Sequence, residues 1–155
     1  MKQLGLVDIK KCEILIDIDP SIPAMLGVSM LQKMVIFRGE HFNSIKNKCL
    51  RNQLEIPFPA LSWAIDTIEI GFGKSPDEGG LPRDVLHAET VIDDEEIYLR
   101  RTMNCGAPYQ QGYTLKSFSR SSYINPRSHQ SVQLPDYLLF DEGLLEKLKL
   151  IASGI

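Results

Sequence analysis

The predicted fold depends first on one stretch, residues 84–103, which reads DVLHAETVIDDEEIYLRRTM. Apolar and polar residues alternate on both sides of its acidic centre, a pattern typical of two β-strands joined by a turn. If the turn lies at residues 94–95, Glu89 faces Arg100 across the pair. The same register pairs apolar residues with each other on the opposite face. We therefore predict an antiparallel β-hairpin over residues 84–103.

A helix over part of this stretch remains an alternative, because Val85, Ala88 and Ile92 also fit helical spacing. Two further strands are predicted to join the hairpin in one sheet. The first covers residues 12–18, where isoleucines alternate with polar residues. The second covers residues 112–124, which include several Tyr and Ser residues.

Apolar residues recur at helical spacing in four other segments, which are residues 24–37, 40–52, 59–69 and 141–152. A run of helices followed by a run of strands favours an α+β fold, with one antiparallel sheet packed against N-terminal and C-terminal helices. No internal sequence repeat is visible. A chain of 155 residues suits one globular domain, so we expect a single α+β domain over residues 1–155.

Composition limits the classes of function. A hydrophobic fraction of 43% and a charged fraction of 24% are typical of a soluble globular protein. The net charge of −3 disfavours a general nucleic-acid binder. Three widely spaced cysteines without a C-x-x-C motif indicate reduced thiols. No signal peptide or membrane-spanning run is visible, so we expect a cytoplasmic protein without a membrane partner.

The charge of the chain changes abruptly at Ile97. Eight acidic residues and one basic residue lie between Asp77 and Glu96, whereas residues 97–135 contain no Asp or Glu. This acid-free stretch carries five basic residues, which are Arg100, Arg101, Lys116, Arg120 and Arg127. A segment of this kind is typical of an anion-binding surface, so we expect a small polar or anionic ligand.

The strand over 112–124 predicts where that ligand binds. Its odd-numbered residues share one face, with tyrosines at the ends and small hydroxyl residues between them, which would leave a hollow. A helix that fills this hollow is the alternative. The candidate ligand-binding residues are Tyr98, Arg100, Arg101, Tyr113, Ser117, Ser119, Arg120 and Tyr123. Arg101 and Arg120 are the preferred anion ligands, because arginine holds a phosphate or carboxylate with two parallel hydrogen bonds.

Two other functions are consistent with the hairpin. A small acid–base enzyme would use His87 as a base, with Glu89 or Arg100 to orient it. A protein-interaction or inhibitor module would use the acidic tip, residues 93–96, against a basic partner. A solvated sheet face with one ion pair is the structural alternative to the His87 cluster.

No metal or cofactor is expected. The segment Gly71–Ser75 resembles the end of a P-loop, but Ile68 occupies the position of the first glycine of that motif. The three histidines, His41, His87 and His129, share no metal-ligand spacing. We also expect a homo-oligomer, because apolar residues in the predicted helix 24–37 spread beyond one stripe.

Overall fold

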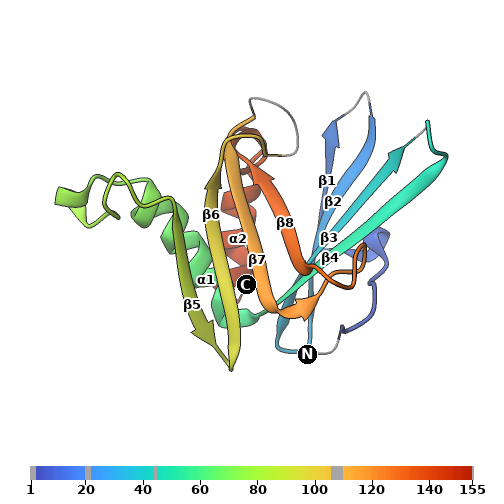
Figure 1. Ribbon diagram of the computed structural model, residues 1–155, viewed down its shortest axis with the longest axis horizontal. Coiled ribbons are helices and arrows are strands. Elements are labelled where there is room, and N and C mark those ends of the chain that lie inside the picture. The colour runs from blue at the N-terminus through green and yellow to red at the C-terminus, as the bar shows by residue number, and fades with distance from the viewer. Residues whose placement is uncertain (1–2, 20–21, 44, 106–109, 155) are drawn as a thin grey trace.

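Two antiparallel β-sheets form the framework of the protein (Figure 1). The computed structural model describes residues 3–19, 22–43, 45–105 and 110–154. The first sheet consists of β1 (Ile14–Asp19), β2 (Ile22–Leu31), β3 (Met34–Asn43) and β4 (Lys48–Pro57). The second sheet consists of β5 (His87–Ile92), β6 (Glu95–Thr102), β7 (Gly112–Ser121) and β8 (His129–Pro135). Consecutive strands are neighbours in each sheet, so both sheets are meanders.

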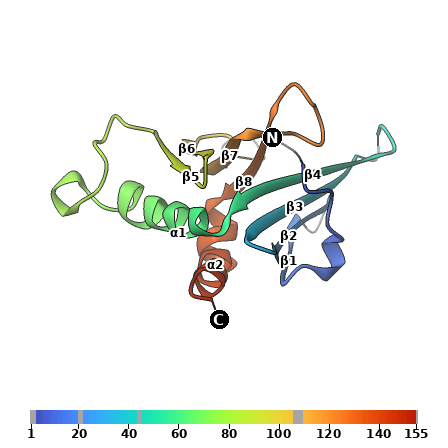
Figure 2. The ribbon, with the colours of Figure 1, turned by 90° about the horizontal axis from the view of Figure 1, so that it is seen from below.

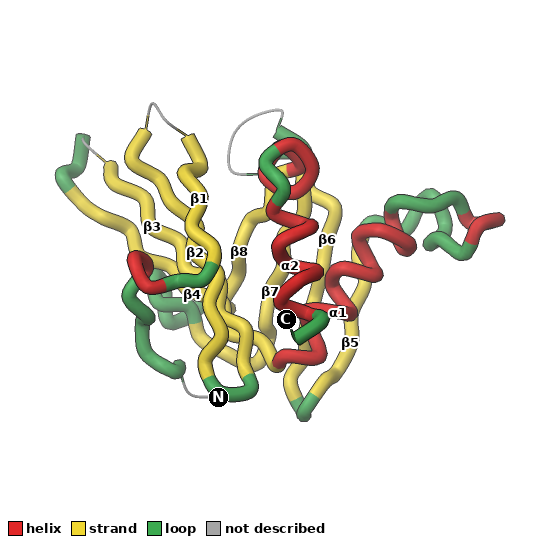
Figure 3. Tube along the Cα trace, turned by 180° about the vertical axis from the view of Figure 1, so that it is seen from behind, coloured by secondary structure: helices red, strands yellow, loops and turns green. Residues whose placement is uncertain are grey.

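A helical segment follows each sheet. After β4, α1 (Phe58–Asp66) continues into the π-helical turns of η2 (Thr67–Phe72). After β8, the π-helical turn η4 (Tyr137–Asp141) precedes α2 (Leu144–Ala152). Short 3-10 turns form η1 (Ile9–Lys11) and η3 (Pro76–Glu78). Four strands followed by helical turns thus occur twice along the chain, although the sequence shows no repeat. Figure 3 shows α1 and α2 on the same side of the second sheet.

The face of each sheet that is turned toward α1 and α2, here called the inner face, is apolar. Successive side chains of a strand point to opposite faces, so alternate residues enter the core. Residues from both sheets and both helices join in one cluster, which includes Val28, Phe37, Leu54, Leu61, Ile97, Leu99, Leu115, Leu144 and Leu148. One hydrophobic core therefore serves both sheets.

The opposite faces, here called the outer faces, differ between the two sheets. The N-terminal segment lies over the outer face of the first sheet, where the Arg38 side chain donates to the Val7 carbonyl at 3.1 Å. Gln53 donates to the Gly5 carbonyl at 2.8 Å, and Ile9 is buried. On the outer face of the second sheet lies no helix or strand of the described chain, as Figure 2 shows. This face is therefore open to a ligand or partner.

The predicted α+β fold with a single sheet is wrong, because the segments 24–37 and 40–52 form strands β2, β3 and β4 instead of helices. A tight turn joins β2 to β3, and its residue Gln32 has a φ of 57°. Val35 and Ile36 are both fully buried although they point to opposite faces. A strand covered on both faces is apolar throughout, so its pattern resembles a broad helical stripe.

The predicted hairpin is present, but its register is wrong by two residues. The turn consists of Asp93 and Asp94, which have φ values of 51° and 63°. Positive φ at both central residues is typical of a type I′ turn, which suits the twist of a hairpin. Glu89 consequently faces Tyr98, and His87 faces Arg100. An even shift leaves the residues of β5 and β6 on their predicted faces.

The other predicted elements are confirmed with shifted ends. The segments 12–18, 59–69, 112–124 and 141–152 correspond to β1, α1 with part of η2, β7 and α2. Strand β8 was not predicted. The apolar residues of 24–37, on which the expected homo-oligomer rested, are only partly buried within the single chain. Leu26, Val28 and Val35 are buried, whereas Met25, Met30 and Met34 are half-buried and Leu31 is exposed. None of the helices in the described chain is long and apolar enough to cross a membrane.

Candidate functional site

The outer face of the second sheet carries a row of rings, one from each strand. His87 on β5 stacks on Tyr98 of β6 with ring centroids 5.5 Å apart. Tyr98 contacts Phe118 of β7 at 5.3 Å, and Phe118 contacts His129 of β8 at 5.0 Å. These separations are within the range of favourable aromatic pairs. The row forms because each strand places alternate residues on this face, and the register makes His87 and Phe118 diagonal neighbours of Tyr98.

Two cations lie beside this row. Lys116 on β7 is directly across from Tyr98, and Arg100 on β6 is across from Thr114. Arg100 and Lys116 are therefore diagonal neighbours on the same face. Lys116 Nζ lies 5.7 Å from the centroid of the Phe118 ring. Within the described parts of the chain, neither cation forms an ion pair with a carboxylate.

The two cations and two of the rings, Tyr98 and Phe118, border a hollow with a volume of about 580 Å³. Its lining includes Leu86, Tyr98, Arg100, Met103, Lys116 and Phe118. Two hydroxyl groups add polar character, since Thr102 Oγ1 and Thr114 Oγ1 are 2.8 Å apart and both residues line the hollow. The hollow thus combines positive charge, aromatic rings and hydroxyl groups, a combination that suits a polar ligand with an apolar part.

The acid-free stretch supplies most of this face. Strands β7 and β8, and β6 from Ile97 onward, lie within residues 97–135, so they contribute no carboxylate. The acidic side chains nearest in register are Glu89 on β5, across from Tyr98, and Glu96 at the start of β6. The positive potential of Arg100 and Lys116 is therefore not cancelled by carboxylates of β7 or β8.

Of the predicted ligand-binding residues, the structure brings Tyr98 and Arg100 together at this hollow. Arg101 is at its rim, but it is held by Asp136 through two hydrogen bonds of 2.7 Å. The hydrogen bond to Asp136 raises the pKa of Arg101. Asp136 is the first acid after the acid-free stretch, so a carboxylate of the chain itself occupies the Arg101 guanidinium group.

The remaining predicted residues lie elsewhere. Tyr113 and Ser117 are on the inner face and are buried, so the helical layer fills the hollow expected there. Burial raises the pKa of Tyr113. Ser119 accepts a hydrogen bond from the backbone of Glu96 at 3.0 Å. Arg120 is held internally by Glu95 at 2.7 Å, so neither of the preferred anion ligands has a free guanidinium group.

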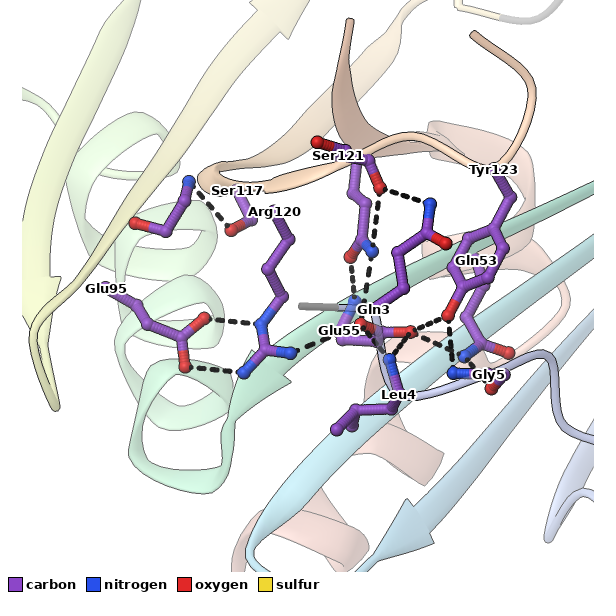
Figure 4. Close-up of polar contacts among 12 residues, drawn as sticks. Gln3, Leu4, Gly5, Gln53, Glu55, Glu95, Ser117, Arg120, Ser121 and Tyr123 are labelled. Carbon is purple, nitrogen blue, oxygen red and sulfur yellow. Dashed lines mark hydrogen bonds and ion pairs between the residues drawn. The ribbon is translucent and has the colours of Figure 1, made fainter. Parts of the chain in front are cut away.

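Figure 4 shows a buried polar network around Glu55 of β4, a residue that the sequence analysis did not select. The Glu55 carboxylate accepts hydrogen bonds from Arg120 and from Gln130, at 3.3 and 3.1 Å, and from the Tyr123 hydroxyl. It also accepts from the backbone of Leu4 at 3.1 Å. The network joins the two sheets and the N-terminal segment. Because groups of the protein itself donate to the Glu55 carboxylate, we assign the network a structural role rather than a ligand site.

The candidate ligand-binding residues chosen from the sequence did not include Lys116 and Phe118, or the Thr102 and Thr114 hydroxyls. Lys116 was named only as one of the five basic residues of the acid-free stretch. Lys116 and Phe118 both lie in that stretch, but the analysis favoured the odd-numbered residues of 112–124. The alternation of odd- and even-numbered residues along the strand shows which face each side chain occupies. The odd-numbered Leu115 is apolar, which indicates an inner face, so the even-numbered Lys116 and Phe118 should share the outer face with Arg100 after pairing.

The acid–base candidates His87 and Glu89 lie on β5, the strand at the edge of the second sheet. Their side chains are 54% and 64% exposed, and His87 Nε2 is 3.9 Å from Glu89 Oε1. Water reaches both groups freely. At the acidic tip, Asp93, Asp94 and Glu96 are exposed, whereas Glu95 is turned inward to Arg120.

Among the described residues, no group of three or more His, Cys, Asp or Glu side chains is placed to hold a metal ion. No protein-family model matches the chain, and a search of curated proteins finds no match either. The candidate site therefore depends on geometry and charge alone.

Proposed function

We propose that this protein binds a small anionic ligand on the outer face of its second sheet, between Arg100 and Lys116. The observation that carries the proposal is the pairing of these two cations, which lie diagonal to each other and share one hollow. Neither has a carboxylate partner in the described chain. A ligand with a phosphate or carboxylate group would supply that partner.

The surroundings support an anion over a neutral ligand. An arginine presents several N–H donors in a planar fork that matches two oxygens of a phosphate or carboxylate, while a lysine adds a compact charge. The neighbouring Thr102 and Thr114 hydroxyls can donate or accept further hydrogen bonds. The aromatic wall of Tyr98 and Phe118 reduces contact with water on one side of the hollow.

The test is thermal unfolding in the presence of inorganic phosphate, sulfate, acetate, citrate and phosphate monoesters at constant ionic strength. A ligand that binds only the native state raises the melting temperature, and above its Kd the stabilisation grows with the logarithm of the ligand concentration. We expect at least one anion to stabilise the wild-type protein, and the effect to be lost in Arg100→Gln and Lys116→Gln. The control is Arg51→Gln, which removes an exposed cation from the first sheet.

Two results would refute the proposal. One is the absence of stabilisation by every anion, including phosphate monoesters. The other is equal stabilisation of wild type, Arg100→Gln and Lys116→Gln, because a site built from these cations requires them.

A further inference from the structure

We infer that the ligand of this face is a nucleoside phosphate, in which a planar aromatic ring is joined through a sugar to a phosphate group. The inference rests on the proposed anion site and adds the chemistry of the rest of the ligand. The evidence for it is the row of rings, which an inorganic anion would not contact by stacking.

The rings are placed to receive an aromatic group. Tyr98 and Phe118 both line the hollow, and their ring planes are inclined at 63°. The Tyr98 and Phe118 side chains are half-buried, so part of each ring remains accessible. Aromatic side chains on the open face of a β-sheet are a common surface for stacking of nucleobases, because every base has a planar π-face.

The cations lie at a suitable distance from these rings. Lys116 is directly across from Tyr98, and Arg100 lies two residues beyond Tyr98 on the same strand. Side chains that are direct or diagonal neighbours in a sheet are separated by roughly 5–8 Å. A sugar bridges a similar gap between a base and its phosphate. The Thr102 and Thr114 hydroxyls lie near Arg100 in register, where they can bind sugar hydroxyls.

Charge and size favour a mononucleotide. A phosphate monoester carries a charge of about −1.5 to −2 at neutral pH, which matches two cations better than a carboxylate does. The hollow of about 580 Å³ is within the usual range for small-ligand sites. Glu89 and Glu96 border the row at β5 and at the start of β6, and the net charge is −3, so a long polyanion would meet repulsion.

The test compares AMP, GMP, CMP and UMP with adenosine and with inorganic phosphate, by calorimetric titration of the full chain. We expect at least one mononucleotide to bind more tightly than phosphate or adenosine. Tyr98→Leu and Phe118→Leu should each weaken nucleotide binding roughly five- to a hundredfold, the usual effect of losing one stacking ring, and leave phosphate binding unchanged. Arg100→Gln should weaken both.

The matched control is Phe140→Leu, which removes an exposed ring from η4 that does not line the hollow. It should leave nucleotide binding unchanged. Thermal melting of each ligand-free variant checks that it folds, and the two ring variants provide independent tests if one of them does not.

The outcomes separate this inference from the proposed function. If phosphate binds as tightly as every mononucleotide, the nucleotide assignment is refuted and the anion site stands. If neither phosphate nor any nucleotide binds, both are refuted. If a single-stranded oligonucleotide of about ten residues binds far more tightly per nucleotide than a mononucleotide, the ligand is a nucleic acid and the assignment to a small molecule is refuted.

Discussion

Arg120 of β7 holds the carboxylate of Glu95 on β6 through two hydrogen bonds, from Nε to Oε1 at 2.7 Å and from Nη2 to Oε2 at 3.0 Å. Its remaining Nη1 group reaches Glu55 of the first sheet at 3.3 Å. All three side chains are almost fully buried. One arginine therefore bridges two buried carboxylates that come from different sheets.

Arg120→Met should destabilise the protein by about 3–5 kcal/mol, because it leaves two carboxylates buried without their cation. The methionine preserves most of the side-chain length, so the loss would reflect charge rather than volume. Urea denaturation monitored by circular dichroism measures the change in free energy of unfolding.

The control for this variant is Arg51→Met, at an arginine that is 60% exposed and 3.9 Å from Glu40. It should change the free energy of unfolding by no more than about 0.5 kcal/mol. A similar effect of the two substitutions would contradict the assigned role of Arg120.

Gly27 permits the N-terminal segment to lie close to β2. A Cβ atom at this position would be 2.7 Å from Cys12 Sγ and 3.2 Å from Ile9 Cγ1. Gly27→Ala should therefore destabilise the protein by about 1–3 kcal/mol, the usual cost of overpacking. Gly39→Ala is the matched control in the neighbouring strand, since its Cβ would meet only Asn52, at 3.7 Å or more.

Gly39→Ala should be neutral or stabilise the protein by up to about 1 kcal/mol, because alanine restricts the unfolded chain. Urea denaturation of both variants gives the comparison, and Cys12→Ala combined with Gly27→Ala should recover part of the loss. Equal stability of the two single variants would show that the N-terminal segment does not pack on Gly27.

The spacing of apolar residues in the sequence predicted the helices and strands that pack against the core on one face only. The hairpin over 84–103 and the helix from residue 59 were found because they alternate or repeat cleanly. Strands β2 and β3 were not found over 24–37, since Ile36 and Phe37 are fully buried and the N-terminal segment covers the outer face. The N-terminal segment covers this face through contacts between residues far apart in the chain, and the local spacing of apolar residues does not reveal such contacts. The segment 40–52 is largely exposed, and its few apolar residues also fit helical spacing.

The candidate site was predicted in part for a similar reason. The acid-free stretch indicated an anion-binding surface, and Arg100 with Tyr98 was among the chosen residues. Arg101 and Arg120 were chosen because their carboxylate partners, Asp136 and Glu95, could not be seen in the sequence. Glu95 lies in the predicted hairpin tip, where an exposed side chain was expected. Whether an arginine is paired with a carboxylate depends on tertiary contacts. Its availability for a ligand can therefore be judged only from the structure.

Cys49 and Cys105 should differ in reactivity. Cys49 is exposed, and its Sγ donates to Glu40 at 3.1 Å, which raises its pKa but leaves it accessible. Cys105 is buried, and burial raises its pKa to about 11. Iodoacetamide at about pH 8 should therefore alkylate Cys49 in the native protein and Cys105 only after unfolding, because the reaction needs an accessible thiolate.

Peptide mass spectrometry after timed alkylation distinguishes the two sites, with a urea-unfolded sample as the control for intrinsic reactivity. Alkylation of Cys105 at the rate of Cys49 in the native protein would show that the core around β7 opens readily.

Tyr123 should make stability depend on pH in alkaline solution. Its hydroxyl donates to Glu55, and burial together with this hydrogen bond raises the pKa of Tyr123 to about 12 from an ordinary value of 10.0. Below pH 10 the phenol is protonated in both states. Between about pH 10 and 12 the unfolded chain ionises first, so unfolding releases a proton and becomes easier as pH rises.

Tyr123→Phe removes both the hydrogen bond and this titration. At about pH 8 the variant should be less stable than wild type by about 1–3 kcal/mol, since Glu55 loses one donor. The difference should then shrink as pH rises through 10 toward 12, because only the wild-type protein loses the contribution of Tyr123. Urea denaturation of both proteins at intervals from about pH 8 to 11 measures the difference, and a constant gap would contradict a protonated, buried Tyr123 as a donor to Glu55.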